Sequence, residues 1–400
     1  MKKLLQIIIF IFVSVLILDP ADLIFNLKIP LLGLILLVWL IIKSKQSIKN
    51  VDRTAIICFF ILLFTSIYGI TIAILQSNLD DEDFALGFIK SIVLFCLIFV
   101  INDQQINMEK ILLKAAVFIP VIVISCYFLY LYNMGLYSKI SVFLVVQKNA
   151  AMFSLRDYLG FQVLMLYYKT SALLAFPLAY YWDKFFTGRS KIKNILKVIL
   201  YAVALFLSAT RANMIALVVI LILIPFIKIK TKFIRMFFIG TIIVGLIAGI
   251  FYLFHISVEQ KETSATVKSG HITSMEEELI RKPEYFIWGQ GLGSRFFSKG
   301  SNAYIVQSEW TYFEIIRLFG LPIGLLFLSV FLFPLFVMIK KREVYNCTYF
   351  IIAYTCYLFI AGTNPLLVSS TGILTLLIVY SKLFYLEKTY SSGFRSVWSG

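Results

Sequence analysis

Residues 203–224 read VALFLSATRANMIALVVILILI, two apolar runs separated by the short polar stretch from Ser208 to Asn213. This stretch is too short for a soluble loop, and its only charge is that of Arg211. Two helices that turn sharply at a boundary between lipid and water would give the pattern. Hydroxyl and amide side chains at 208, 210 and 213 could then cap the helix ends. The stretch therefore predicts a helical hairpin in a membrane.

The composition of the whole chain extends this prediction. Its 400 residues are 60% hydrophobic, against about 45–50% in soluble domains. Long apolar runs recur along the chain, and a membrane helix needs roughly 20 such residues. We expect an all-α, polytopic membrane protein with about twelve spans and one large external loop. The predicted spans cover residues 4–19, 29–42, 54–75, 86–101, 111–132, 159–182, 195–208, 212–227, 236–254, 309–338, 346–362 and 367–386.

Basic residues between these spans indicate the orientation of the chain. Lysine- and arginine-rich segments recur on one predicted side, which by the positive-inside rule is the cytoplasm. These segments are residues 2–3, 43–53, 183–194, 228–235 and 340–342. Charge at the membrane surface therefore accounts for the net charge of +16, and no nucleic-acid partner is expected. The first helix resembles a secretory signal without a cleavage site, so we expect it to be retained.

Three regions follow from this arrangement. Residues 1–254 would form the transmembrane core with nine spans, and 255–308 the external loop. Residues 309–400 would form three further spans and a cytoplasmic tail. The five cysteines fall within or beside predicted spans, and the chain has only two histidines. We therefore predict neither a disulfide framework nor a metal site, and no cofactor.

Cations in or beside predicted spans are the first candidates for function. Arg211 would either anchor the hairpin turn in the interface or bind an anion, since guanidinium suits phosphate oxygens and a helix begins just after it. Lys169, within span 159–182, allows the same two interpretations. Arg317 lies between Glu309 and Glu314 on a predicted helix. It would either pair with Glu314 at i, i+3 or tune a functional carboxylate.

The predicted loop holds the second set of candidates. Gly289, Gly291 and Gly293 favour a tight turn with positive φ, because the segment lacks the ending of a nucleotide-binding loop. Arg295 follows directly and could reach an anion. Aromatic residues nearby would form a local core or sugar-stacking platforms. His271 is either incidental or a general base near neutral pH.

The order of these features resembles the bacterial O-antigen polymerase and O-antigen ligase-like membrane proteins. The resemblance covers most of the chain as architecture, and residues 190–330 most specifically. It rests on SATRAN (208–213), then two spans and a large loop ending in PEYFIWGQGLGS (283–294). The segment SEWTYFEIIRLFGLPIGLLFL (308–328) follows.

The resemblance implies glycosyl transfer at the outer face of the inner membrane, with undecaprenyl-pyrophosphate-linked glycans as donor and acceptor. The large loop would be periplasmic, and a chain-length regulator protein is a candidate partner. Arg211, the three loop glycines, Glu309 and Gly320 match the family pattern. The ligase branch has a histidine where this chain has Gln307 and Ser308, which favours a polymerase.

On this basis, Arg211 is the first candidate to bind the pyrophosphate, with Arg295 and Lys169 as further candidates and Arg317 as an orienting cation. Glu309 or His271 would be the general base. Two alternatives stay open. One is a ligase that transfers finished glycan to lipid A core or protein, and the other is a flippase for lipid-linked oligosaccharides.

Overall fold

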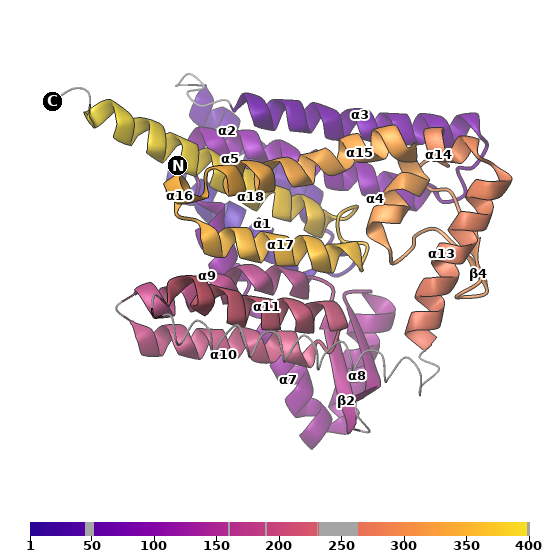
Figure 1. Ribbon diagram of the computed structural model, residues 1–400, viewed down its shortest axis with the longest axis horizontal. Coiled ribbons are helices and arrows are strands. Elements are labelled where there is room, and N and C mark those ends of the chain that lie inside the picture. The colour runs from indigo at the N-terminus through magenta and orange to yellow at the C-terminus, as the bar shows by residue number, and fades with distance from the viewer. Residues whose placement is uncertain (45–51, 159–160, 189, 230, 232–262, 398–400) are drawn as a thin grey trace.

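The computed structural model describes residues 1–44, 52–158, 161–188, 190–229, 231 and 263–397, and it is mostly helical (Figure 1). The first half contains α1 (Lys2–Leu18), α2 (Lys28–Lys43), α3 (Arg53–Leu75), α4 (Glu82–Val93), η1 (Leu94–Cys96), α5 (Leu97–Gln104), α6 (Met108–Ala115), α7 (Phe118–Tyr132), α8 (Met134–Ser141), the π-helix η2 (Val142–Gln147), β1 (Ala151–Tyr158), β2 (Phe161–Tyr168), η3 (Ser171–Leu174) and α9 (Ala175–Thr187). The second half contains α10 (Lys191–Leu207), α11 (Arg211–Lys228), α13 (Thr263–Arg281), α14 (Glu284–Trp288), β3 (Phe296–Ser298), β4 (Ala303–Ile305), α15 (Thr311–Lys340), α16 (Arg342–Tyr345), α17 (Thr348–Gly362) and α18 (Ser370–Val397).

The long helices run side by side as a bundle with two distinct ends (Figure 1). We call the end where α1 begins the proximal end, and the end that carries α13 and α14 the distal end. Ion pairs close the proximal end, where Lys43 bonds Asp103 and Lys228 bonds Asp183, both at 2.8 Å. Each pair joins two helices at this end of the bundle, α2 with α5 and α11 with α9.

Six of the described helical segments are long and apolar enough to cross a membrane: Arg53–Leu75, Glu82–Gln104, Met108–Tyr132, Arg211–Lys228, Thr311–Lys340 and Ser370–Tyr390. They match six of the predicted spans closely. Shorter helices cover the predicted spans 4–19, 29–42, 195–208 and 346–362. The predicted span 236–254 lies outside the described residues.

The predicted span 159–182 is wrong. Residues 161–168 form β2, which pairs antiparallel with β1 so that Ala151 lies opposite Tyr168, and α9 begins only at Ala175. Leu164 to Tyr168 are all buried, so this strand has two covered faces and no alternation of polar and apolar residues. A short apolar run of this kind cannot be distinguished from a helix by periodicity. The described chain is therefore not purely α-helical.

The predicted loop 255–308 is also more regular than a loop. Its described part, from residue 263, contains α13, α14 and the hairpin of β3 and β4, in which Phe296 lies opposite Ile305. In Figure 1 these elements cover the distal end of the bundle.

Prolines inside the apolar helices are compensated by hydrogen bonds from other elements. A proline has no N–H for the carbonyl four residues earlier, and a membrane offers that carbonyl no water. The carbonyl of Leu221, four before Pro225, accepts from Trp182 Nε1 at 3.0 Å. That of Val330, four before Pro334, accepts from the Tyr380 hydroxyl at 2.8 Å.

Candidate functional site

The glycine loop, residues 288–295, is a tight turn at the distal end. Gly289, Gly291 and Gly293 have φ values of +78°, +90° and +81°, which confirms the predicted positive-φ turn. A Cβ on Gly289 would lie 2.5 Å from the backbone nitrogen of Gly320. A Cβ on Gly291 would overlap the backbone of Ala73 on α3. Only glycine satisfies both the backbone conformation and the space at these positions.

Hydrogen bonds join this loop to a break in α15. Gly320 has φ +72° and ψ 168°, which interrupts the helix, and Pro322 has no N–H for the carbonyl of Leu318. The N–H of Gly291 donates to that carbonyl at 3.0 Å, and the N–H of Gln290 donates to the carbonyl of Arg317 at 2.7 Å. The loop thus supplies donors where α15 lacks its own.

The same loop also contacts the distal end of α3. The N–H of Leu292 donates to the carbonyl of Gly69 at 2.9 Å, and the N–H of Asp81 donates to the carbonyl of Gly293 at 3.0 Å. The amides of Gln290, Gly291 and Leu292 are therefore bonded within the protein. They do not form a cradle for phosphate, in agreement with the predicted role of the glycines.

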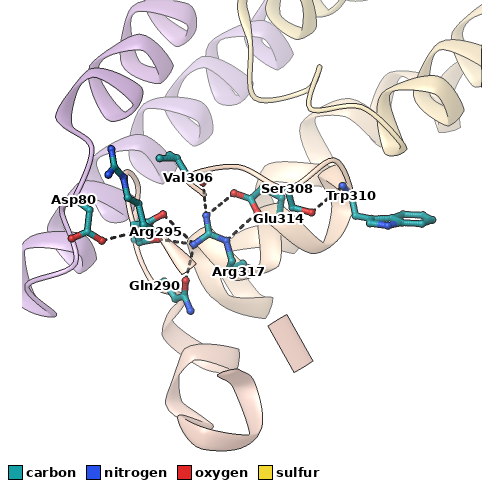
Figure 2. Close-up of polar contacts among 10 residues, drawn as sticks. Asp80, Gln290, Arg295, Val306, Ser308, Trp310, Glu314 and Arg317 are labelled. Carbon is teal, nitrogen blue, oxygen red and sulfur yellow. Dashed lines mark hydrogen bonds and ion pairs between the residues drawn. The ribbon is translucent and has the colours of Figure 1, made fainter. Parts of the chain in front are cut away.

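The side chain of Arg317 lies at the centre of this joint (Figure 2). Its Nη2 bonds Glu314 Oε1 at 2.6 Å and its Nε bonds Glu314 Oε2 at 3.0 Å, while both side chains are buried, at 4% and 0% exposure. Nη1 donates to Gln290 Oε1 at 2.6 Å and to Ser294 Oγ at 2.9 Å. Nη2 also donates to the carbonyl of Val306 at 2.8 Å. The guanidinium carbon lies 4.7 Å from the ring centroid of Phe296.

The predicted Glu314–Arg317 pair is therefore confirmed, and it is structural. All five N–H groups of Arg317 have acceptors inside the protein, which is the full donor capacity of a guanidinium. A pyrophosphate would have to displace a buried carboxylate. In this conformation Arg317 has no N–H left to donate to a substrate, and its role as an orienting cation stays a prediction.

The two weaker cationic candidates also have partners. Arg295 bonds Asp81 Oδ2 at 3.1 Å, and its side chain is 46% exposed. It lines a shallow cavity of about 290 Å³ together with residues of α13 and the β3–β4 hairpin. Lys169 follows β2 directly, and its Nζ donates to Asn149 Oδ1 at 2.5 Å. Burial lowers the pKa of Lys169. Arg295 is exposed enough to meet an anion from solvent, whereas Lys169 would have to leave its bond to Asn149.

A second group of polar residues, the distal cluster, comprises Tyr167, Lys268, His271 and Glu309, and the turn that leads to Arg211 packs against Tyr167. Glu309 precedes α15, and its Oε2 lies 3.1 Å from Lys268 Nζ of α13. Lys268 Nζ also donates to the carbonyl of Thr363 at 3.3 Å. Lys268 therefore joins α13 to the segment before α15 and to the end of α17, and the Glu309 side chain at this junction is 42% exposed.

Tyr167 packs against the hairpin turn that leads to Arg211 and lies within electrostatic range of Glu309. Tyr167 is buried and packs against Ala209, two residues before Arg211. Burial raises the pKa of Tyr167, and the negative charge of Glu309 raises it further. Arg211 is half-buried and is the first residue of α11, with Thr210 as the cap. The turn thus lies on one flank of Tyr167 and Glu309 lies within electrostatic range of the same ring.

His271 lies on α13 and is only 4% exposed. Neither ring nitrogen has a hydrogen-bond partner among the described residues. Burial lowers its pKa, partly opposed by the nearby carboxylates of Glu309 and Glu314. The ring is therefore neutral at pH 7 and cannot touch a bound sugar in this conformation, which leaves Glu309 as the accessible candidate for a general base.

The aromatic residues of the distal end divide into two groups. Tyr285 and Phe296 are buried and form the predicted local core. Trp288, Phe297 and Tyr304 are 54%, 42% and 70% exposed, and the last two rings meet edge to face at 5.5 Å. The buried group therefore confirms the predicted local core for these two residues, and sugar stacking on the exposed group stays a prediction.

Sequence analysis missed four residues of these two arrangements: Lys268 and Tyr167 of the distal cluster, and Gln290 and Ser294 around Arg317. Gln290 and Ser294 stand within the glycine segment, so their place beside three glycines was the only available indication. The sequence around Lys268 and Tyr167 contains no motif that marks either residue, and only the fold brings them near Glu309.

Comparison with known proteins adds no assignment. No family model, curated protein or solved structure matches the chain. The described residues form a mostly helical protein with six helices able to span a membrane. Charged residues gather at its distal end.

Proposed function

We propose that the protein is a membrane glycosyltransferase that polymerises undecaprenyl-pyrophosphate-linked repeat units at the outer face of the bacterial inner membrane. In this reaction a sugar hydroxyl of one glycan attacks the anomeric carbon of another. The bond from that carbon to the pyrophosphate oxygen breaks, and the lipid pyrophosphate leaves with the electron pair. The hydroxyl proton passes to a base on the protein. Energy for the new bond comes from the departing pyrophosphate, so the reaction asks for no cofactor.

One observation carries the proposal: the turn that leads into α11 at Arg211 packs against the buried Tyr167, and Glu309, two residues before α15, lies within electrostatic range of the same ring. A helix that begins where lipid ends presents its first residues at the level of the headgroups. A cation at that level suits the negative charge that develops on the departing lipid pyrophosphate, and a carboxylate there suits the proton that the attacking hydroxyl must lose. Positioning two tethered substrates there would supply much of the rate.

The residues take separate roles in this proposal. Arg211 would bind the pyrophosphate through its planar guanidinium, assisted by the first N–H groups of α11. Glu309 would accept the hydroxyl proton, and the neighbouring ammonium of Lys268 would hold its carboxylate in place. His271 is buried within electrostatic range of Glu309, so it would influence Glu309 without touching the substrate. Arg295 and Lys169 would extend the anion site for the second lipid-linked glycan.

The substitution Arg211→Ala tests the proposal. Purified protein in vesicles with a lipid-pyrophosphate-linked repeat unit should make long polymer, and Arg211→Ala should make none at normal abundance. Arg211→Lys should retain part of the activity, since it keeps charge but loses the planar fork. The matched control is Arg342→Ala, which removes an exposed arginine at the proximal end. A full ladder of chain lengths from Arg211→Ala would refute the role of Arg211.

A second experiment assigns the base. Glu309→Gln should lower the turnover number by roughly 10²–10⁴-fold, the usual contribution of general base catalysis. Glu343→Gln, which changes an exposed carboxylate on α16 at the proximal end, is the control and should leave turnover unchanged. Unchanged turnover in Glu309→Gln would exclude Glu309, and His271→Ala would then be the decisive variant.

Deletion of the gene separates the three candidate activities. A single capped repeat unit at the cell surface indicates a polymerase. Loss of all surface sugar indicates a flippase, and accumulation of lipid-linked polymer indicates a ligase. The structure offers no observation that favours the flippase or the ligase over the polymerase.

A further inference from the structure

A groove lies at the proximal end of the bundle, opposite the distal cluster. It has a volume of about 560 Å³ and runs between the first turns of α1 and the start of α6. This volume falls within the roughly 300–1,000 Å³ typical of small-molecule sites. The residues that line it are Lys3, Gln6, Ile7, Phe10, Ile106, Asn107, Lys110, Ile111 and Lys114.

The lining is cationic at its rim and apolar below. Lys3, Lys110 and Lys114 bring three ammonium groups to one groove, and none of the described residues that line it is acidic. In the described part of the chain these three lysines have no ion pair. Lys110 and Lys114 are also one turn apart on α6, where like charges repel. The groove therefore holds uncompensated positive charge.

The nearest carboxylate on α6 is turned to the other side of the helix. Glu109 is buried, and its Oε2 and Oε1 bond Lys382 Nζ and the Tyr349 hydroxyl at 2.5 and 2.6 Å. Its two oxygens are bonded to residues of α17 and α18, so Glu109 does not neutralise the lysines of the groove. Among the described residues no carboxylate lines the groove, so an anion from outside would be the partner that neutralises it.

Apolar side chains complete the site. Ile7 is 56% exposed although it belongs to an apolar helix, and Phe10, Ile106 and Ile111 lie beside it. A soluble anion would leave this apolar surface in water. A molecule with a phosphate group and an acyl chain would satisfy the rim and the floor together, and basic grooves at the end of membrane helices suit anionic headgroups.

We propose that this groove binds an anionic phospholipid, with the headgroup phosphate between Lys3, Lys110 and Lys114 and one acyl chain along Ile7 and Phe10. The lipid would join α1 to α6 at the membrane boundary opposite the distal cluster. The proposal does not depend on the activity of the distal cluster.

Lipid binding to the full-length protein tests it. Native mass spectrometry with added dioleoyl-phosphatidylglycerol should show a defined adduct, while dioleoyl-phosphatidylcholine should bind at least tenfold more weakly. The variant Lys3→Gln/Lys110→Gln/Lys114→Gln should lose roughly tenfold to a hundredfold in affinity. High salt should weaken the adduct, because the rim is exposed to solvent.

The matched control is Lys191→Gln/Lys193→Gln/Lys340→Gln. It removes the same charge from exposed lysines near the proximal ends of α10 and α15, outside the groove. An equal loss in this control would show general attraction to surface charge and overturn the proposal. So would equal binding of the two lipids, or displacement of the lipid by millimolar glycerol phosphate, which would indicate a site for a soluble phosphate. Unchanged melting curves in both variants establish that the fold is intact.

Discussion

Replacing Arg317 by methionine would leave the carboxylate of Glu314 buried without its cation. Glu314 is 0% exposed, and Arg317 supplies bonds to both of its oxygens. Breaking a buried pair in this way typically costs about 3–5 kcal/mol of folding free energy. The same substitution removes the donors that Gln290 and Ser294 now meet, so the glycine loop would keep only its two backbone hydrogen bonds to α15.

The cost translates into a change in melting temperature. The entropy of unfolding is about 2.1 cal/mol/K per residue, so about 3–5 kcal/mol over a chain of 400 residues corresponds to a fall of roughly 4–6 °C. Tryptophan fluorescence of the detergent-solubilised protein would measure it. The double variant Arg317→Met/Glu314→Leu removes both charges and should recover most of the loss, because apolar replacement of a buried pair is often close to neutral.

Three results would refute this reasoning. A fall below about 1–2 °C for Arg317→Met would show that the pair does not carry the joint. Normal stability with complete loss of polymerising activity would return Arg317 to the substrate site. A double variant no more stable than the single one would mean that the cost comes from the loop contacts rather than from the unpaired carboxylate.

The remaining predictions concern the glycines and the buried histidine. Gly291→Ala should destabilise the protein by about 1–3 kcal/mol or more, because φ is +90° and a Cβ would overlap the α3 backbone. Gly33→Ala, where a Cβ would meet nothing within 4 Å, should be neutral or stabilising by up to about 1 kcal/mol, and equal melting temperatures would contradict the contrast. Burial lowers the pKa of His271 below the ordinary 6.5, so the unfolded chain takes up the proton first and stability falls as the pH drops below that value. His271→Leu should therefore show a flatter melting profile between pH 7 and 5, and an unchanged slope would exclude this source.

Much of the helical fold follows from hydropathy alone. The predicted spans 54–75, 86–101, 111–132 and 212–227 coincide with described helical segments within a few residues. The apolar runs there are long, and the polar residues between them stop the helices. Hydropathy fails at 159–182, because the strand β2 is buried on both faces and its run from Leu164 to Tyr168 has the same composition as a helix.

The candidate site is also only partly predictable from the sequence. Positive φ at the glycines and the pair at i, i+3 are local properties, so the sequence predicts them. The partners of Arg317 at Gln290 and Ser294 are 27 and 23 residues away, and no local pattern indicates them. Lys268 and Tyr167 reach Glu309 only through packing between distant elements.

The joint between the glycine loop and α15 constrains the order in which the protein can be assembled. During synthesis α3 emerges first, and the carbonyl of Gly69 has no hydrogen bond from Leu292 until more than two hundred further residues have been made. The break at Gly320 in turn needs Gln290 and Gly291 already in place. A nascent chain that stops before α15 would leave the backbone N–H groups of Gln290 and Gly291 without their acceptors. Cellular quality control could recognise this exposed surface of an incomplete protein.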